Sequence, residues 1–143
     1  MDAQTLLQGE DRGWEQLTEA FGRIPSERFE EPTLTLAGWS PKDVMFHVAA
    51  WAEEATRVLG RIAAGTHRQG VVDVETLNRE WFEISRGMDP DVVRLRFAKA
   101  RTAMREALER LEEVDAVAAE WFDESGPRHY AEHLPDLRAF PDR

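Results

Sequence analysis

The chain contains no cysteine, and this absence removes several kinds of chemistry at once. It excludes disulfides, thiolate metal sites and a cysteine nucleophile. No apolar run approaches the roughly 18 residues that a membrane-spanning helix needs, so we expect no membrane span. The start of the chain carries neither a basic segment nor an apolar run, so we expect no secretory signal and a cytoplasmic location.

Basic residues are also scarce. The sequence has 18 Lys and Arg against 28 Asp and Glu, which gives a formal charge of −10. A protein with this balance repels phosphate backbones, so we expect no nucleic-acid partner. The sequence further lacks a glycine-rich phosphate loop, a Gly-x-Ser-x-Gly motif and an HExxH motif.

The length and composition nevertheless favour a folded protein. The chain has 143 residues, of which 42% are hydrophobic, so it can bury roughly 68–70% of its unfolded surface. No internal repeat, low-complexity tract or linker interrupts it. We therefore expect one domain spanning residues 1–143.

Start and stop signals divide the chain into helical segments. The strongest start is Ser40-Pro41, with Asp43 placed to complete the cap, and Gly65 marks the end of that helix. An exposed i,i+4 pair is expected between Glu53 and Arg57. The connection at 24–39 is expected to be irregular. Helices are expected at about 4–22, 41–64, 74–86, 90–111, 115–121 and 129–140, which predicts an all-α four-helix bundle with additional short helices.

Two of the four histidines have the spacing of metal ligands. His129 and His133 are separated by one helical turn and about 40° around the axis. Imidazoles at this spacing can point at one cation about 2 Å from each nitrogen. Leu137 and Phe140 lie near the same helical face, so we expect the pair to point into the bundle.

A third histidine lies at the edge of an apolar stripe. His47 is one turn from both Val44 and Trp51, and a buried imidazole needs a partner. His47, His129 and His133 would together form a three-nitrogen site with an open position, a ligand set that suits zinc, nickel or ferrous iron. The alternative is that they are hydrogen-bonded core residues. His67, in a glycine-flanked loop, is expected to be exposed.

Other polar residues have less certain roles in the sequence. Glu54 lies two turns after His47 and is either an additional ligand or base, or solvated surface. Asp73 either caps a helix, which its position favours, or lines the mouth of the bundle. Asn78 is either a turn residue or part of the mouth of the bundle.

The last predicted helix carries further candidates. Tyr130, Glu132 and the preceding Glu124 could be hydrogen-bond partners of metal-bound histidines. Pro135 removes one helical hydrogen bond. It either kinks the helix just after the histidine pair or ends it early.

Two segments resemble a known superfamily. Residues 38–51, GWSPKDVMFHVAAW, resemble the GW(S/T)xKDVLxHLxxW segment of DinB-like four-helix proteins, and residues 129–134, HYAEHL, resemble their terminal HxxxH segment. The middle of the chain, with Asp73 to Asn78 and then residues 90–111, resembles the ClbS/DfsB branch. The resemblance spans about residues 3–140.

This resemblance implies an up-down-down-up bundle that holds a divalent metal on His47, His129 and His133, and a homodimer as a common state. Superfamily members include transferases and isomerases that use bacterial low-molecular-weight thiols (mycothiol or bacillithiol), and toxin-resistance proteins of the ClbS type. Mycothiol-dependent maleylpyruvate isomerases tend to carry Glu at the position of His129, so this residue departs from them.

Three functions are consistent with these patterns. The first is a metal-dependent enzyme, either a thiol S-transferase or isomerase, or a hydrolase that uses metal-activated water. Because the chain lacks cysteine, its thiol would have to be an external one. The second is a non-catalytic protein of the ClbS/DfsB type that binds a small toxic molecule. The third is a purely structural interaction module.

Overall fold

The computed structural model describes residues 2–143, and those residues contain helices and no strand. The α-helices are α1 (Ala3–Gly22), α2 (Pro41–Ala64), α3 (Val74–Arg86), α4 (Pro90–Glu109), α5 (Ala116–Ser125) and α6 (Pro127–Ala139). Short 3-10 turns lie at Ser26–Arg28 and Phe140–Asp142. The predicted all-α class is confirmed.

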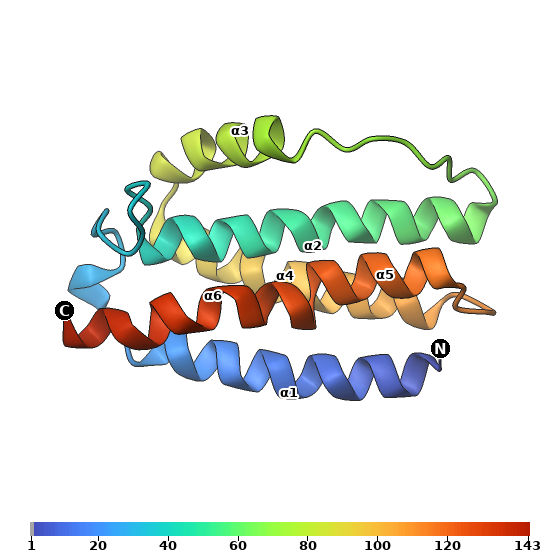
Figure 1. The fold of residues 1–143 in the computed structure, drawn as a ribbon, viewed down its shortest axis with the longest axis horizontal. Helices are drawn as coiled ribbons and strands as arrows, with labels where there is room; N and C mark the ends of the chain where they lie inside the picture. The colour runs from blue at the N-terminus through green and yellow to red at the C-terminus, as the bar shows by residue number, and fades with distance from the viewer. Residues whose placement is uncertain (1) are drawn as a thin grey trace.

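The bundle consists of α1, α2, α4 and an arm made of α5 and α6 in succession. Figure 1 shows α1 and the α5–α6 arm running in one direction and α2 and α4 in the other, so the order is up-down-down-up. The crossover from α2 to α4 consists of the loop at residues 65–73 and α3, which lies alongside α2 outside the bundle (Figure 1). The topology implied by the resemblance is therefore confirmed.

The start of α2 follows its sequence signals. The Ser40 side chain accepts a hydrogen bond from the Asp43 backbone N–H, and the Asp43 carboxylate accepts one from the Ser40 backbone N–H. This capping box satisfies two donors that the helix leaves free. The other Asp43 oxygen accepts a 2.6 Å hydrogen bond from the Ser85 hydroxyl of α3. The start of α2 is thus fixed to the end of α3.

A glycine separates α5 from α6. A Cβ atom on Gly126 would lie 2.8 Å from the backbone oxygen of Phe122, closer than real Cβ contacts allow. The chain turns here and resumes at Pro127, which suits the first position of a helix. Pro135 lies inside α6, and the helix continues to Ala139. Of the two outcomes considered for Pro135, an early end is therefore wrong.

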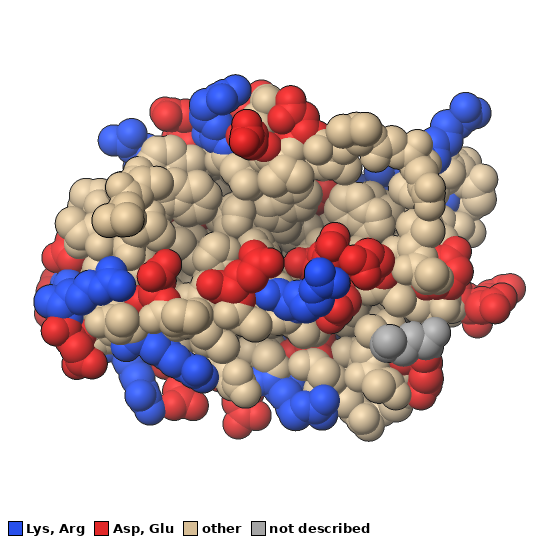
Figure 2. All heavy atoms as spheres, in the orientation of Figure 1, with Lys and Arg blue, Asp and Glu red and all other residues tan. Residues whose placement is uncertain are grey.

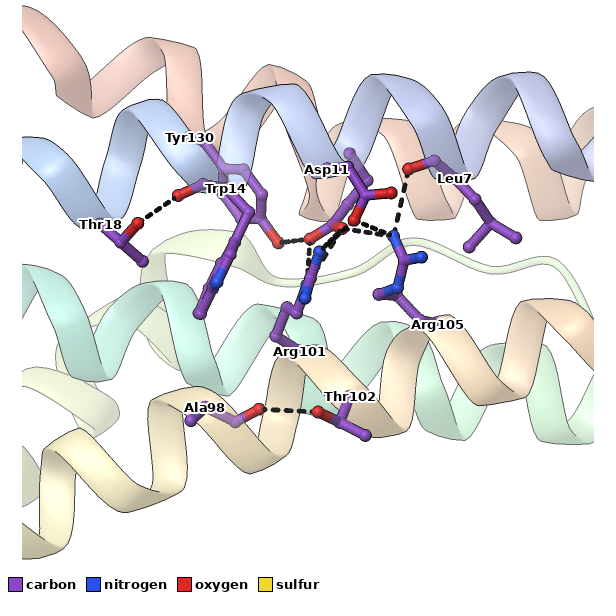
Figure 3. A network of polar contacts seen from close by, with 10 residues as sticks. Leu7, Asp11, Trp14, Thr18, Ala98, Arg101, Thr102, Arg105 and Tyr130 are labelled. Carbon is purple, nitrogen blue, oxygen red and sulfur yellow. Dashed lines mark hydrogen bonds and ion pairs between the residues drawn. The ribbon is translucent and has the colours of Figure 1, made fainter.

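A buried charged network joins three helices of the bundle (Figure 3). Glu10 of α1 is fully buried and accepts hydrogen bonds from Arg101 and Arg105 of α4 and from the Tyr130 hydroxyl of α6. Asp11 accepts a further bond from Arg101. Because a buried carboxylate is tolerated only when it is paired and hydrogen-bonded, this network fixes how the three helices pack.

Some local predictions were wrong. The expected Glu53–Arg57 pair does not form, because Glu53 faces α4 and is held by both Nε and Nη2 of Arg96 at 2.8 Å. Arg57 pairs instead with Glu54. The predicted helix at 115–121 extends to Ser125, and α4 ends at Glu109, before Leu111.

Candidate metal centre

Three histidine side chains meet inside the bundle. The Nε2 atom of His129 lies 2.9 Å from Nε2 of His47 and 3.1 Å from Nε2 of His133. One ring nitrogen from each residue lies within 4.8 Å of the other two. The structure therefore brings together the three residues that the sequence patterns predicted to converge.

Local structure explains the convergence. His129 and His133 occupy successive turns of α6, and their rings lie edge to face with centroids 4.8 Å apart. His47 lies on α2, less than two turns after the capping box. Its ring packs edge-on against Trp39, which stacks in turn on Phe82 of α3. The loop before α2, which carries Trp39, and helix α3, which carries Phe82, therefore both help to hold the His47 ring.

Burial keeps the three rings uncharged near neutral pH. His47 and His129 are each 7% exposed, and His133 is half-buried. Burial, with a smaller contribution from His133, lowers the pKa of His47 to about 3. Burial and the other two histidines hold the pKa of His129 well below its usual value, and burial lowers the pKa of His133. Neutral imidazoles are the form that binds a metal ion.

The donor set fits a metal ion. Three nitrogens in a tetrahedral site with bonds of about 2.0–2.1 Å lie about 3.3 Å from one another, and the two closest pairs here lie near that spacing. Within residues 2–143, Nδ1 of His47 and Nδ1 of His129 are buried without a hydrogen-bond partner. The polar contacts of both rings therefore lie on the Nε2 side, where the three histidines converge.

A cavity of about 330 Å³ adjoins the histidines. It lies between α2, α3 and the α5–α6 arm, and Figure 2 shows a hollow between α3 and that arm with acidic side chains along its edge. Trp51 lines this cavity and donates a 2.9 Å hydrogen bond from Nε1 to Asn78 of α3. Asn78 thus belongs to the cavity mouth, one of the two roles considered for it. The lining residues are His47, Trp51, Val72, Val74, Asn78, Trp121, Glu124, Ser125, Arg128, His129 and Glu132.

The remaining candidates are divided between this cavity and other places. Glu124 and Glu132 line it, whereas the Tyr130 side chain is bonded to Glu10 between the helices. Tyr130 is therefore placed as part of the charged network. Asp73 caps α3, because its carboxylate accepts a hydrogen bond from the Thr76 backbone N–H.

Glu54 and His67 lie at a neighbouring cavity. Glu54 is paired with Arg57 and is outside the histidine cluster. His67 was predicted to be exposed but is half-buried, and it lines this cavity together with residues of α2 and α5. The glycines flanking His67 indicated a loop and said nothing of what packs against that loop.

Sequence reasoning missed the Glu10 network and the role of Trp39. A signal for Glu10 existed, since it lies three and four residues after Leu7 and Leu6 within the apolar stripe of α1. A charged residue at such a position is buried against a partner. The contact between Trp39 and His47 had no comparable signal, because it depends on the path of the irregular loop before α2.

The fold and the cluster define the class of protein: an all-α four-helix bundle with three histidines that could hold a metal ion. The chain belongs to the DinB-like family described as mycothiol maleylpyruvate isomerase N-terminal domain, whose profile matches residues 11–140. The match includes all three histidines. The ClbS/DfsB likeness of the middle segment stays a prediction.

Other comparisons give no closer relation. No curated protein and no solved structure matched the chain. Within residues 2–143, none of the helices combines the length and apolar character needed to cross a bilayer.

Proposed function

We propose that His47, His129 and His133 hold a divalent cation, and that the protein is a metal-dependent S-transferase or isomerase using an external low-molecular-weight thiol. The observation that carries this proposal is the convergence of three uncharged imidazole nitrogens beside a cavity. Membership of a family named for mycothiol supports a thiol of that kind. The absence of cysteine means that the protein cannot supply the thiol itself.

A bound cation would lower the pKa of a coordinated thiol or water, so that a thiolate or hydroxide exists near neutral pH. The residues around the site then have separate tasks. The tryptophans Trp51 and Trp121 contribute apolar surface to the cavity beside the histidines. Burial and the neighbouring Glu120 raise the pKa of Glu124, which lines the same cavity. A carboxylate with a raised pKa is suited to accept and return a proton.

A second candidate function is non-catalytic binding of a small toxic molecule. The observation in its favour is the composition of the cavity, in which Trp51, Val72, Val74 and Trp121 offer apolar contact that requires no reaction. A ligand that raises the melting temperature and is recovered unmodified would support this function, whereas turnover would exclude it.

Elemental analysis of protein purified without a histidine tag tests the proposal. We expect about one equivalent of a divalent metal per chain, with zinc or nickel ahead of iron, because a nitrogen site binds ferrous iron more weakly than nickel. His129→Ala and His133→Ala should lose the metal while retaining helical circular dichroism. His67→Ala is the matched control and should keep the metal, because His67 lies outside the cluster. Near-zero metal that added zinc or nickel does not restore would refute the proposal.

The thiol requirement is tested separately. Metal-loaded protein is incubated with mycothiol or bacillithiol and candidate electrophiles, and thiol consumption is followed. Consumption that requires all three histidines supports the enzyme. Hydrolysis without any thiol would instead favour metal-activated water.

We also propose that residues 1–143 form one domain and that the protein is a homodimer. The buried apolar side chains of the described residues form a single cluster drawn from all four arms of the bundle, as expected of one domain. The dimer follows from the resemblance to the superfamily. Light scattering of the purified protein would test it, with the mass of one chain as the contrary result.

A further inference from the structure

A second, larger cavity adjoins the cavity at the histidines. Its volume is about 670 Å³, and it lies between the end of α2, the loop at residues 65–72 and α5. The two cavities share Val72 and Trp121 as lining residues. A molecule long enough to occupy both cavities would therefore pass along these two side chains.

The carboxylates that line the second cavity have ion-pair partners, whereas its guanidinium groups have none among the described residues. Both of its carboxylates have arginine partners: Glu54 pairs with Arg57 at 2.6 Å, and Glu120 lies 3.3 Å from Arg128, which it shares with Asp123 and Glu124. Its two guanidinium groups, Arg61 and Arg68, have no carboxylate oxygen within 4.0 Å among residues 2–143.

A third group in the same cavity is also uncommitted. Nδ1 of His67 is buried and has no hydrogen-bond partner within the described part of the chain. The cavity thus offers two guanidinium groups and one ring nitrogen that are not committed to a partner within the described residues.

Apart from Gln69 and Gly70, the remaining side chains that line the second cavity are apolar. The side chains that contribute this surface are Val58, Val71, Val72, Ala116, Val117 and Trp121. Val71 is fully exposed to solvent, so a ligand in the cavity would cover an aliphatic side chain that nothing in residues 2–143 covers. A ligand that matches both features carries an anionic group on an apolar stem.

We propose that the second cavity binds the anionic end of an organic anion, a carboxylate or a phosphate held by Arg61 and Arg68, while the rest of the ligand extends past Trp121 toward the histidines. This inference deepens the proposed function and rests on it for what happens at the histidines. The binding of the anion itself needs no metal. Because both arginines are exposed, solvent screens their attraction, and we expect the two together to contribute about tenfold in affinity.

The test is a titration of the metal-free protein with three probes of equal chain length: hexanoate, hexyl phosphate and hexanol. Binding is followed by tryptophan fluorescence and by calorimetry at low salt. We expect at least one of the two anions to bind about tenfold more tightly than hexanol, and this advantage to shrink at 0.5 M salt. The preferred anion then identifies the head group. Equal binding of all three probes would overturn the inference.

Two double variants decide whether the arginines are responsible. Arg61→Gln/Arg68→Gln should bind the anions no better than hexanol, while Arg61→Lys/Arg68→Lys should retain part of the advantage because it keeps the charge. Arg12→Gln/Arg138→Gln is the matched control, since it removes the same charge from exposed positions that line neither cavity. Equal loss in both glutamine variants would also overturn the inference, because it would show a general effect of net charge.

The failures of the two proposals are distinguishable. Arg61→Gln/Arg68→Gln should still bind about one equivalent of zinc. Zinc binding without any preference for the anions would refute only the anion site. A preference for the anions in a protein that binds no metal would refute only the metal centre.

Discussion

The hydroxyl of Tyr130 donates a 2.8 Å hydrogen bond to the carboxylate of Glu10, which is fully buried. Tyr130 follows His129 directly in α6, yet the two side chains leave the helix toward different neighbours, one toward α1 and one toward α2. Burial and the adjacent Glu10 carboxylate hold the pKa of Tyr130 well above its usual value, so its hydroxyl remains a donor. The bond therefore fixes the rotation of the helix that carries two of the three histidines.

Removing either partner should cost stability, and by different amounts. Tyr130→Phe deletes one donor to a charged acceptor and should lower the free energy of unfolding by about 1–2 kcal/mol. Glu10→Ala leaves Arg101 and Arg105 without their shared carboxylate and should cost about 3 kcal/mol. Thr18→Ala on the same helix is the control and should change stability by less than about 0.5 kcal/mol, because its hydroxyl bonds only within α1. Urea denaturation measures all three, and equal costs for Tyr130→Phe and Thr18→Ala would contradict the role of the network.

Zinc should stabilise the folded protein. At a free zinc concentration one hundred times the dissociation constant, the gain is about 2.7 kcal/mol, which for a chain of this length raises the melting temperature by roughly 5–10 °C. Differential scanning fluorimetry with and without zinc measures the shift. The double variant His129→Ala/His133→Ala should show none. A shift of the same size in that variant would mean that zinc binds elsewhere.

Acid should destabilise the metal-free protein. In the unfolded chain each histidine has a pKa of about 6.5, whereas in the folded protein the pKa of His47 is lowered to about 3 and those of His129 and His133 are also lowered. Above pH 6.5 both states are uncharged at these rings. As the pH falls below 6.5, the histidines of the unfolded chain bind protons that the buried histidines of the folded protein do not bind, and the free energy of unfolding therefore falls.

The expected loss is therefore up to about 1.4 kcal/mol per pH unit for each histidine, and for His47 it continues to about pH 3. Denaturation at pH 7.5, 6.5 and 5.5 measures it above the range in which most carboxylates titrate. His129→Gln removes one of these titrations, so its stability should fall less steeply than that of the unchanged protein. Parallel curves for the two proteins would contradict the burial of the cluster.

Replacing each of two glycines by alanine should change the stability of the protein in opposite directions. Gly126→Ala places a Cβ atom 2.8 Å from a backbone oxygen, which must move, and should cost about 1–3 kcal/mol. Gly60→Ala, inside α2, meets no atom within 4 Å and should stabilise the protein by about 0.5–1 kcal/mol. Thermal melts of the two variants measure the difference. A stabilised Gly126→Ala would show that α5 and α6 can join without the glycine.

Much of the fold could be predicted because its signals are local. Ser40 and Asp73 were recognised as helix starts from one or two neighbouring residues, and both side chains accept the expected capping hydrogen bonds. Errors arose where a partner came from another helix. Glu53 was assigned to Arg57 from spacing along α2 alone, and Arg96 of α4 is its actual partner.

In the candidate site, too, the features with local sequence signals were predicted, and those that depend on neighbouring helices were not. The spacing of His129 and His133 identified the pair, and the position of His47 in an apolar stripe identified the third member. The sequence could not separate Tyr130 from the histidines, because a single residue step in α6 turns a side chain by about 100° toward a different neighbour. It also did not show that His67 lies against a cavity.

By itself the sequence determined the capped helix starts, the inward faces and the three histidines, because capping and periodicity act over a few residues. It also determined that any thiol must come from outside, since the chain has no cysteine. The tertiary structure alone decided how close the three imidazoles come, that Glu10 ties α6 to α4, and that Arg61 and Arg68 share a cavity with no carboxylate partner among the described residues. Those relationships join residues far apart in the chain, and only the packing of the helices sets their distances.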